Sequence, residues 1–173
     1  MRFETIYEQI KAAEAIACVA HHGQYRRDGR TPYITHPEAV ARIVMMPKLR
    51  PIAWLHDVVE DTLITLPQIN AVGFDYYILA AVRDLTRHKE TTYEVYIRER
   101  VCPNPEAVPV KIADMLHNLS CQPSQNSVAK ARWALPMLRE ALEKHWPGQY
   151  PWLHQEVKFP SIVESPSHPA EVL

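Results

Sequence analysis

The stretch from Leu55 to Thr62 reads Leu-His-Asp-Val-Val-Glu-Asp-Thr and sets four polar side chains inside an apolar segment. In a helix, His56 and Glu60 lie four residues apart, as do Asp57 and Asp61, so each pair stacks along one side. The leucine and valines around them indicate a helix that is otherwise largely buried. Because buried carboxylates and imidazoles need partners, a metal ion is one way to satisfy several of them at once.

A His-Asp dipeptide often occurs by chance, so this stretch alone is weak evidence for a metal site. Two other residues strengthen it, His36 at the expected start of a helix and Asp114 on a separate helix. With His56 and Asp57 they provide two imidazoles and two carboxylates, a mixed set that suits Mn²⁺, Fe²⁺ or Zn²⁺. Four protein ligands on an octahedral ion leave positions for water and substrate, which hydrolysis requires.

Helical periodicity extends outward from this stretch over most of the chain. The one β-branched run continues with helical spacing, and each of the four glycines stands where a periodic segment stops. The sequence contains neither Gly-x-Gly-x-x-Gly nor a Walker-type loop, which argues against dinucleotide-binding and P-loop folds. The pattern predicts an all-α bundle of about eight helices, at residues 3–22, 36–46, 51–62, 65–73, 75–87, 92–101, 105–119 and 127–145.

The length and the distribution of proline predict one domain and a tail. A chain of 173 residues buries a single core. Five of the fifteen prolines fall within residues 147–169, too densely for regular structure. We therefore expect a helical domain over residues 1–146 and an extended, proline-rich tail over residues 147–173.

Charge and cysteine content limit the possible partners and the compartment. A net charge of −1 argues against a broad basic face for a nucleic-acid polymer, whereas local basic clusters at residues 26–30 and 83–89 suit a small phosphorylated ligand. Three cysteines without Cys-x-x-Cys spacing fit free thiols in a reducing compartment. No apolar stretch approaches the length of a membrane span. We expect a cytoplasmic protein that does not bind a membrane.

Three motifs occur in the order typical of one family: Arg26-Arg-x-Gly-x-x-Pro-Tyr-Ile-x-His-Pro37, then the stretch from Leu55 to Thr62, then Val110-Lys-Ile-Ala-Asp-Met-Leu-His-Asn-Leu119. Together they resemble the HD hydrolase domain of RelA/SpoT-type enzymes, which remove the 3′-pyrophosphate of (p)ppGpp, and the free-standing small alarmone hydrolases. The match covers about residues 20–119. Three linked motifs are far more specific than any one of them.

The resemblance implies an all-helical HD fold and a metal site. The implied ligands are His36, His56, Asp57 and Asp114, usually for manganese, although Zn²⁺ and Fe²⁺ suit the same set. Two further acidic residues, Glu60 and Asp61, would polarise the attacking water and handle the proton for the leaving group.

The resemblance also implies substrate-binding residues. Arg26 or Arg27 would stack on a base or clamp a phosphate, Lys111 would face the phosphates or the acidic site, and Asn118 would hydrogen-bond the sugar. Simpler interpretations stay open, because the arginines fit an exposed basic loop and Lys111 fits a cover on the acidic cluster. Met115 stands where the family often has arginine, so the resemblance does not determine the composition of the substrate pocket.

The leading functional prediction is Mn²⁺-dependent hydrolysis of (p)ppGpp to GDP or GTP and pyrophosphate. One alternative is another nucleotide phosphohydrolase, for example one that removes the 2′-phosphate of NADPH. Another is a non-catalytic HD module that regulates a partner. The expected partner is a small nucleotide, and the sequence does not specify an oligomeric state.

Overall fold

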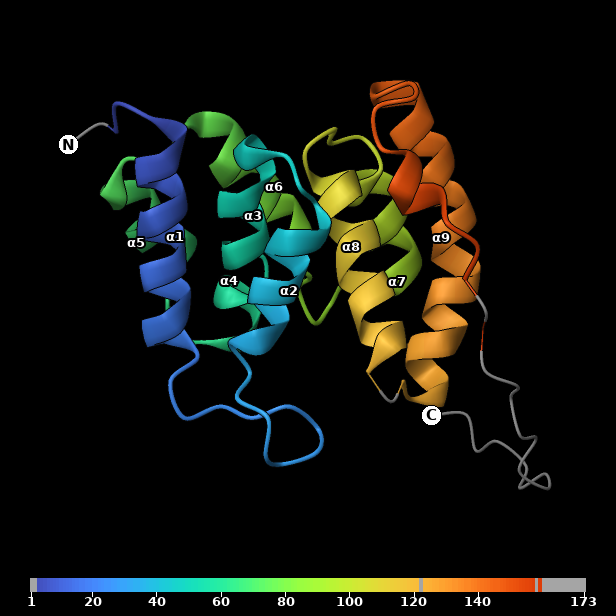
Figure 1. The fold of residues 1–173 in the computed structure, drawn as a ribbon, viewed down its shortest axis with the longest axis horizontal. Coiled ribbons are helices and arrows are strands. Elements are labelled where there is room, and N and C mark those ends of the chain that lie inside the picture. Colours follow the sequence, from blue (N-terminus) through green and yellow to red (C-terminus); the bar gives the residue numbers. More distant parts are fainter. Residues whose placement is uncertain (1–2, 122, 158, 160–173) are drawn as a thin grey trace.

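The computed structural model describes residues 3–121, 123–157 and 159, and it confirms the predicted all-α fold (Figure 1). The described residues contain no β-strand, only an isolated bridge between Tyr25 and Pro32. The α-helices are α1 (Ile6–Ala20), α2 (Thr35–Ile43), α3 (Arg50–Leu55), α4 (Val58–Asp61), α5 (Leu66–Val72), α6 (Tyr76–Leu85), α7 (Tyr93–Val95), α8 (Ala107–Ser120) and α9 (Gln125–His145). Shorter turns are the 3₁₀ segments η1 (Pro47–Leu49) and η3 (Pro151–His154) and the π-helical η2 (Tyr96–Val101).

Local sequence signals account for several helix ends. Thr5 caps α1 through a capping box with Glu8, and Thr65 and Gln68 form the same arrangement at the start of α5. Each box satisfies backbone N–H groups that have no partner within the helix. Gly73 ends α5 at a φ of 100°, a left-handed conformation that other residues rarely adopt.

The predicted continuous helix over residues 51–62 is wrong. Helix α3 ends at Leu55, and α4 begins only at Val58. The Nδ1 of His56 lies 2.7 Å from the carbonyl oxygen of Ala53, and the φ of −101° and ψ of −8° at Asp57 depart from the ideal helical values of about −63° and −42°. This break places the His-Asp pair in a turn between two helices.

The core brings three parts of the chain together. Helix α3 packs against α1 and α2, α2 packs against α8, and α8 packs against α9. In Figure 1, α2 and α3 lie between α1 on one side and α8 and α9 on the other. Ile52 and Leu55 of α3 and Ile112 of α8 are completely buried, so the polar side chains beside them are held by a rigid apolar framework.

The predicted extended tail is not confirmed where the structure describes it. Its first part forms the 3₁₀ turn η3, in which Leu153 is fully buried and the Trp152 indole donates a hydrogen bond of 2.9 Å to the last carbonyl of α2. Residues 160–173 lie outside the described residues. The division into residues 1–146 and 147–173 stays a prediction. Among the helices of the described residues, none is long and apolar enough to cross a membrane.

Candidate metal centre and substrate pockets

Four predicted metal ligands converge from three elements. His36 lies at the start of α2, His56 and Asp57 in the α3–α4 turn, and Asp114 in α8. Ligand atoms of the two histidines and Asp57 lie within 4.8 Å of one another. Asp114 lies slightly apart from this group, with Oδ1 3.1 Å from the Nε2 of His36 and 4.0 Å from that of His56.

The orientation of His56 fits a metal ligand. Its Nδ1 donates a proton to the Ala53 carbonyl, so Nε2 is the nitrogen left to bind a metal. This Nε2 is buried without a hydrogen-bond partner and lies 3.1 Å from the Oδ2 of Asp57. An unsatisfied buried nitrogen that faces carboxylates is what a divalent cation would satisfy.

The close packing of imidazoles and carboxylates in the centre shifts the pKa values of His56, Asp57 and Asp114. Burial alone would lower the pKa of His56, but Asp57 and Asp114 outweigh it and raise this pKa to about 9. Burial opposes ionisation of Asp57 and Asp114, yet their cationic neighbours hold both pKa values below the usual range. Both carboxylates are therefore ionised, as metal ligands must be.

His117 holds the second nitrogen of His36. The two Nδ1 atoms lie 2.7 Å apart, so one ring donates a proton to the other. Burial and the neighbouring His36 and Arg26 lower the pKa of His117 to about 4, which keeps this ring neutral. A neutral His117 accepts the proton of His36 Nδ1, so the Nε2 of His36, which faces Asp57 and Asp114, is the atom placed to bind a metal. Nothing in the sequence alone indicated that these two rings touch.

Tyr33 connects two of the acidic residues. Its hydroxyl lies 2.6 Å from Oδ2 of Asp57 and 3.1 Å from Oδ2 of Asp61. Burial and the nearby Asp57 raise the pKa of Asp61. Tyr33 belongs to the first sequence motif, but nothing in the sequence indicated that it contacts the acidic pair.

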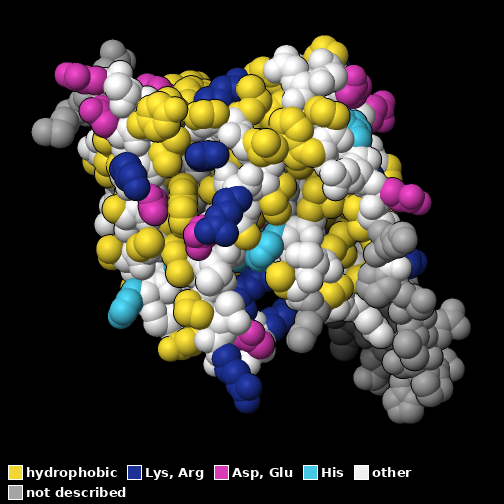
Figure 2. Space-filling view, in the orientation of Figure 1, with side chains coloured by type: hydrophobic (Ala, Val, Ile, Leu, Met, Phe, Trp, Pro, Cys, Tyr) yellow, Lys and Arg dark blue, Asp and Glu magenta, His cyan; other side chains and the backbone are white. Residues whose placement is uncertain are grey.

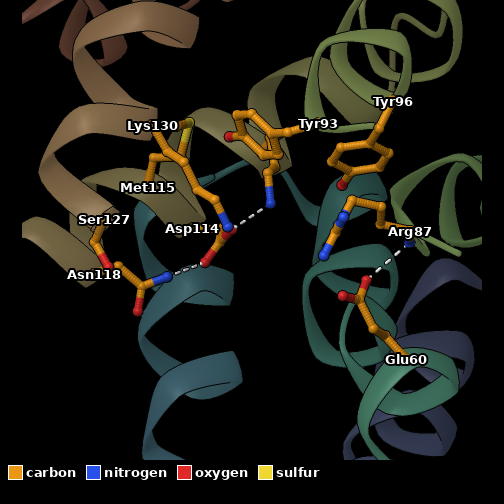
Figure 3. A pocket seen from close by; sticks show the side chains of 10 residues that line it. Glu60, Arg87, Tyr93, Tyr96, Asp114, Met115, Asn118, Ser127 and Lys130 are labelled. Carbon is orange, nitrogen blue, oxygen red and sulfur yellow. Dashed lines mark hydrogen bonds and ion pairs between the residues drawn. The ribbon is translucent and has the colours of Figure 1, made fainter. Parts of the chain in front are cut away.

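The side chain of Glu60 points away from the pair formed by Asp57 and Asp61. Its Oε2 accepts a hydrogen bond of 2.8 Å from the backbone N–H of Arg87, the second residue after α6 (Figure 3). The side chain lines a cavity of about 180 Å³ together with Lys111 and Asp114. The two predicted catalytic carboxylates therefore lie on different sides of the centre.

A larger cavity of about 600 Å³ lies beside the loop between α1 and α2. Arg26 and Arg27 line it together with Tyr25 and His117. Figure 2 shows Lys and Arg side chains gathered around this loop at the lower edge of the molecule. Because small-molecule sites commonly measure ~300–1,000 Å³, this cavity has a suitable size for a nucleotide.

Hydrogen bonds link the larger cavity to the centre. Arg26 donates to Asn118 Oδ1 over 3.0 Å, and the Asn118 amide donates to Asp114 Oδ1 over 2.6 Å. Lys111 Nζ lies 2.9 Å from Asp114 Oδ2. The exposed Arg27 lines the cavity without a described contact to the centre. These positions are compatible with the predicted substrate-binding roles, which stay predictions.

No family model matches the sequence. The chain is 32% identical over 152 residues to the guanosine-3′,5′-bis(diphosphate) 3′-pyrophosphohydrolase MESH1 of Mus musculus, and the match covers 82% of each protein. It belongs to the MESH1 family. The human MESH1 protein matches with the same identity and coverage. The predicted resemblance is confirmed.

Other relatives of this MESH1-family chain are much longer. It is 31% identical to the bifunctional (p)ppGpp synthase/hydrolase SpoT of Escherichia coli, but the match spans only 21% of that protein. A solved structure with 22% identity has a TM-score of 0.66 and covers 84% of this chain and 97% of its own. It is described as a metazoan ortholog of SpoT that hydrolyses ppGpp. This likeness supports the fold.

Proposed function

We propose that this protein is a Mn²⁺-dependent (p)ppGpp 3′-pyrophosphohydrolase. The observation that carries the proposal is the buried group of His36, His56 and Asp57, whose ligand atoms lie within 4.8 Å of one another in a chain related to MESH1 along most of its length. The proposed ligands are these three residues and Asp114. Zn²⁺ and Fe²⁺ are the alternative ions, because imidazole and carboxylate ligands suit all three.

A divalent cation held by His36, His56, Asp57 and Asp114 would act as a Lewis acid that polarises a phosphoryl oxygen and lowers the pKa of bound water. Glu60 accepts the proton of the attacking water. Asp61, whose pKa is raised by burial and by Asp57, delivers a proton to the ribose oxygen that leaves. Tyr33 keeps the Asp61 carboxyl group close to the centre through its hydroxyl group.

The larger cavity is the proposed nucleoside site. The half-buried Arg26 has a planar guanidinium group that stacks on a base or binds a phosphate, and Arg27 adds a second positive charge at the mouth. Asn118 hydrogen-bonds the sugar in this proposal, and its position between Arg26 and Asp114 supports that role. Lys111 keeps positive charge next to Asp114, on the phosphate side.

A small nucleotide is the proposed partner, and the cytoplasm is the proposed location. The net charge of −1 supports a small ligand over a nucleic-acid polymer. The three free cysteines support a reducing compartment.

The test is a panel of nucleotides with purified Mn²⁺-loaded protein. We expect (p)ppGpp to yield GDP or GTP and pyrophosphate, and Asp57→Ala to lower kcat/KM by about 10³-fold because the centre loses a ligand. Glu14→Ala on α1 is the control for a carboxylate that lies far from the centre.

Three other outcomes have a definite meaning. Release of phosphate from NADPH, without pyrophosphate from (p)ppGpp, would identify a different nucleotide phosphohydrolase. Full turnover by Asp57→Ala would contradict the metal assignment. A protein that binds no metal and hydrolyses no member of the panel would be a regulatory module.

A further inference from the structure

The cavity of about 180 Å³ that borders Asp114 is lined by three cationic side chains and, besides Asp114, by the carboxylate of Glu60. Arg87 reaches it from the segment after α6 and Lys130 from α9 (Figure 3), and Lys111 of α8 also lines it. Tyr93 of α7 forms part of the wall. Three cations from three elements therefore approach one small space.

Two of these cations lack a carboxylate partner. Lys111 is paired with Asp114 over 2.9 Å. Within the described part of the chain, Arg87 has only a carbonyl contact, 3.2 Å from Thr91, and the Lys130 ammonium has only the Tyr93 ring, 5.0 Å from its centroid. Burial and the charges of Arg87 and Lys111 lower the pKa of Lys130, and the nearby Glu60 offsets only part of this effect. The repulsion between these groups is relieved if an anion binds between them.

The size of the cavity limits the anion. Sites for whole small molecules measure ~300–1,000 Å³, so a cavity of about 180 Å³ is too small for a nucleoside and suits a single phosphate group. Asn118 and Ser127 line both this cavity and the larger one, which makes the two adjacent. Asp114 of the metal centre also borders the small cavity.

We propose that Arg87 and Lys130 bind the distal phosphate of a substrate diphosphate and make the enzyme selective for diphosphate esters over monophosphate esters. This inference rests on the proposed function. The nucleoside occupies the larger cavity, the phosphorus bonded to the ribose oxygen lies at the centre, and the second phosphate lies between the two cations.

The proposed step balances without a further reactant. The oxygen of water forms a bond to the phosphorus next to the ribose, and the bond from that phosphorus to the ribose oxygen breaks. The electron pair stays on the ribose oxygen, which takes up a proton. Pyrophosphate is released with the hydroxyl group of the water, and nothing is oxidised or reduced.

The test compares two substrates that react at the same bond. One is guanosine 5′-diphosphate 3′-diphosphate, and the other is guanosine 5′-diphosphate 3′-monophosphate. Arg87→Met and Lys130→Met, in the full-length Mn²⁺-loaded protein, should each lower kcat/KM for the diphosphate by about 10- to 100-fold, the effect of one charged hydrogen bond. The monophosphate should change by less than about threefold, because it does not reach these side chains. Lys130→Arg keeps the charge and should restore most of the preference.

Lys144→Met is the matched control, since this exposed lysine lies at the other end of α9. It should leave both substrates unchanged. Equal losses on the two substrates, or no loss with Arg87→Met and Lys130→Met, would overturn the proposal.

Calorimetric binding of inorganic pyrophosphate separates this inference from the proposed function. If the protein hydrolyses no (p)ppGpp but binds pyrophosphate, and Lys130→Met weakens that binding about tenfold or more, the proposed reaction is wrong while the anion site stands. If the protein hydrolyses (p)ppGpp and Lys130→Met leaves pyrophosphate binding unchanged, the proposed reaction stands while the anion site is wrong.

Discussion

Replacement of Tyr33 by phenylalanine removes one hydroxyl group and leaves the aromatic ring in place. That hydroxyl lies 2.6 Å from Asp57 and 3.1 Å from Asp61, and a hydrogen bond to a charged group contributes ~1.5–3 kcal/mol. If this interaction is kept in the transition state, its loss lowers kcat/KM by about 10- to 100-fold. We expect the fall mainly in kcat, because the lost hydroxyl group contacts the acidic residues, whereas the ring, which lines the larger cavity, is kept.

The assay is steady-state hydrolysis of (p)ppGpp at saturating Mn²⁺, together with Mn²⁺ titration by calorimetry and thermal unfolding. Mn²⁺ affinity should fall less than kcat, because Asp57 keeps its charge and its place beside His56. Tyr7→Phe is the control, because Tyr7 is 67% exposed on α1. A Tyr33→Phe protein that keeps kcat within about twofold would refute the positioning argument.

Two further predictions concern the metal centre. His117→Phe removes the acceptor for the Nδ1 proton of His36, and we expect Mn²⁺ affinity to fall by about 10- to 100-fold, as measured by calorimetry, while an unchanged affinity would contradict the assigned contact. Mn²⁺ affinity should also rise with pH up to about 9 and then level off, because the metal-free His56 holds a proton below its pKa of about 9 and must lose it to bind the ion. Calorimetry near pH 7 in buffers of different ionisation enthalpy should detect about one proton released per Mn²⁺, and binding without proton release would contradict a protonated His56 in the metal-free centre.

Local sequence patterns determined the helical class and several helix ends. Apolar residues at helical spacing, the capping box at Thr65 and Gln68, and the glycine after α5 act within a few residues of chain. The four proposed metal ligands could also be predicted from the sequence, because the three motifs carry them in a recognisable order. The sequence therefore predicted the family and the types of side chain at the centre.

Only the tertiary structure decided how those side chains are arranged. The break between α3 and α4 depends on a side-chain hydrogen bond from His56 and on the packing of a buried helix, so helical spacing alone predicted one continuous helix. Tyr33 reaches Asp57 from a loop 24 positions earlier in the chain, and Lys130 and Arg87 line one cavity from distant parts of the chain. Periodicity reports which face of a helix is buried, whereas a site made of several elements depends on which faces pack together, and that is decided by the core as a whole.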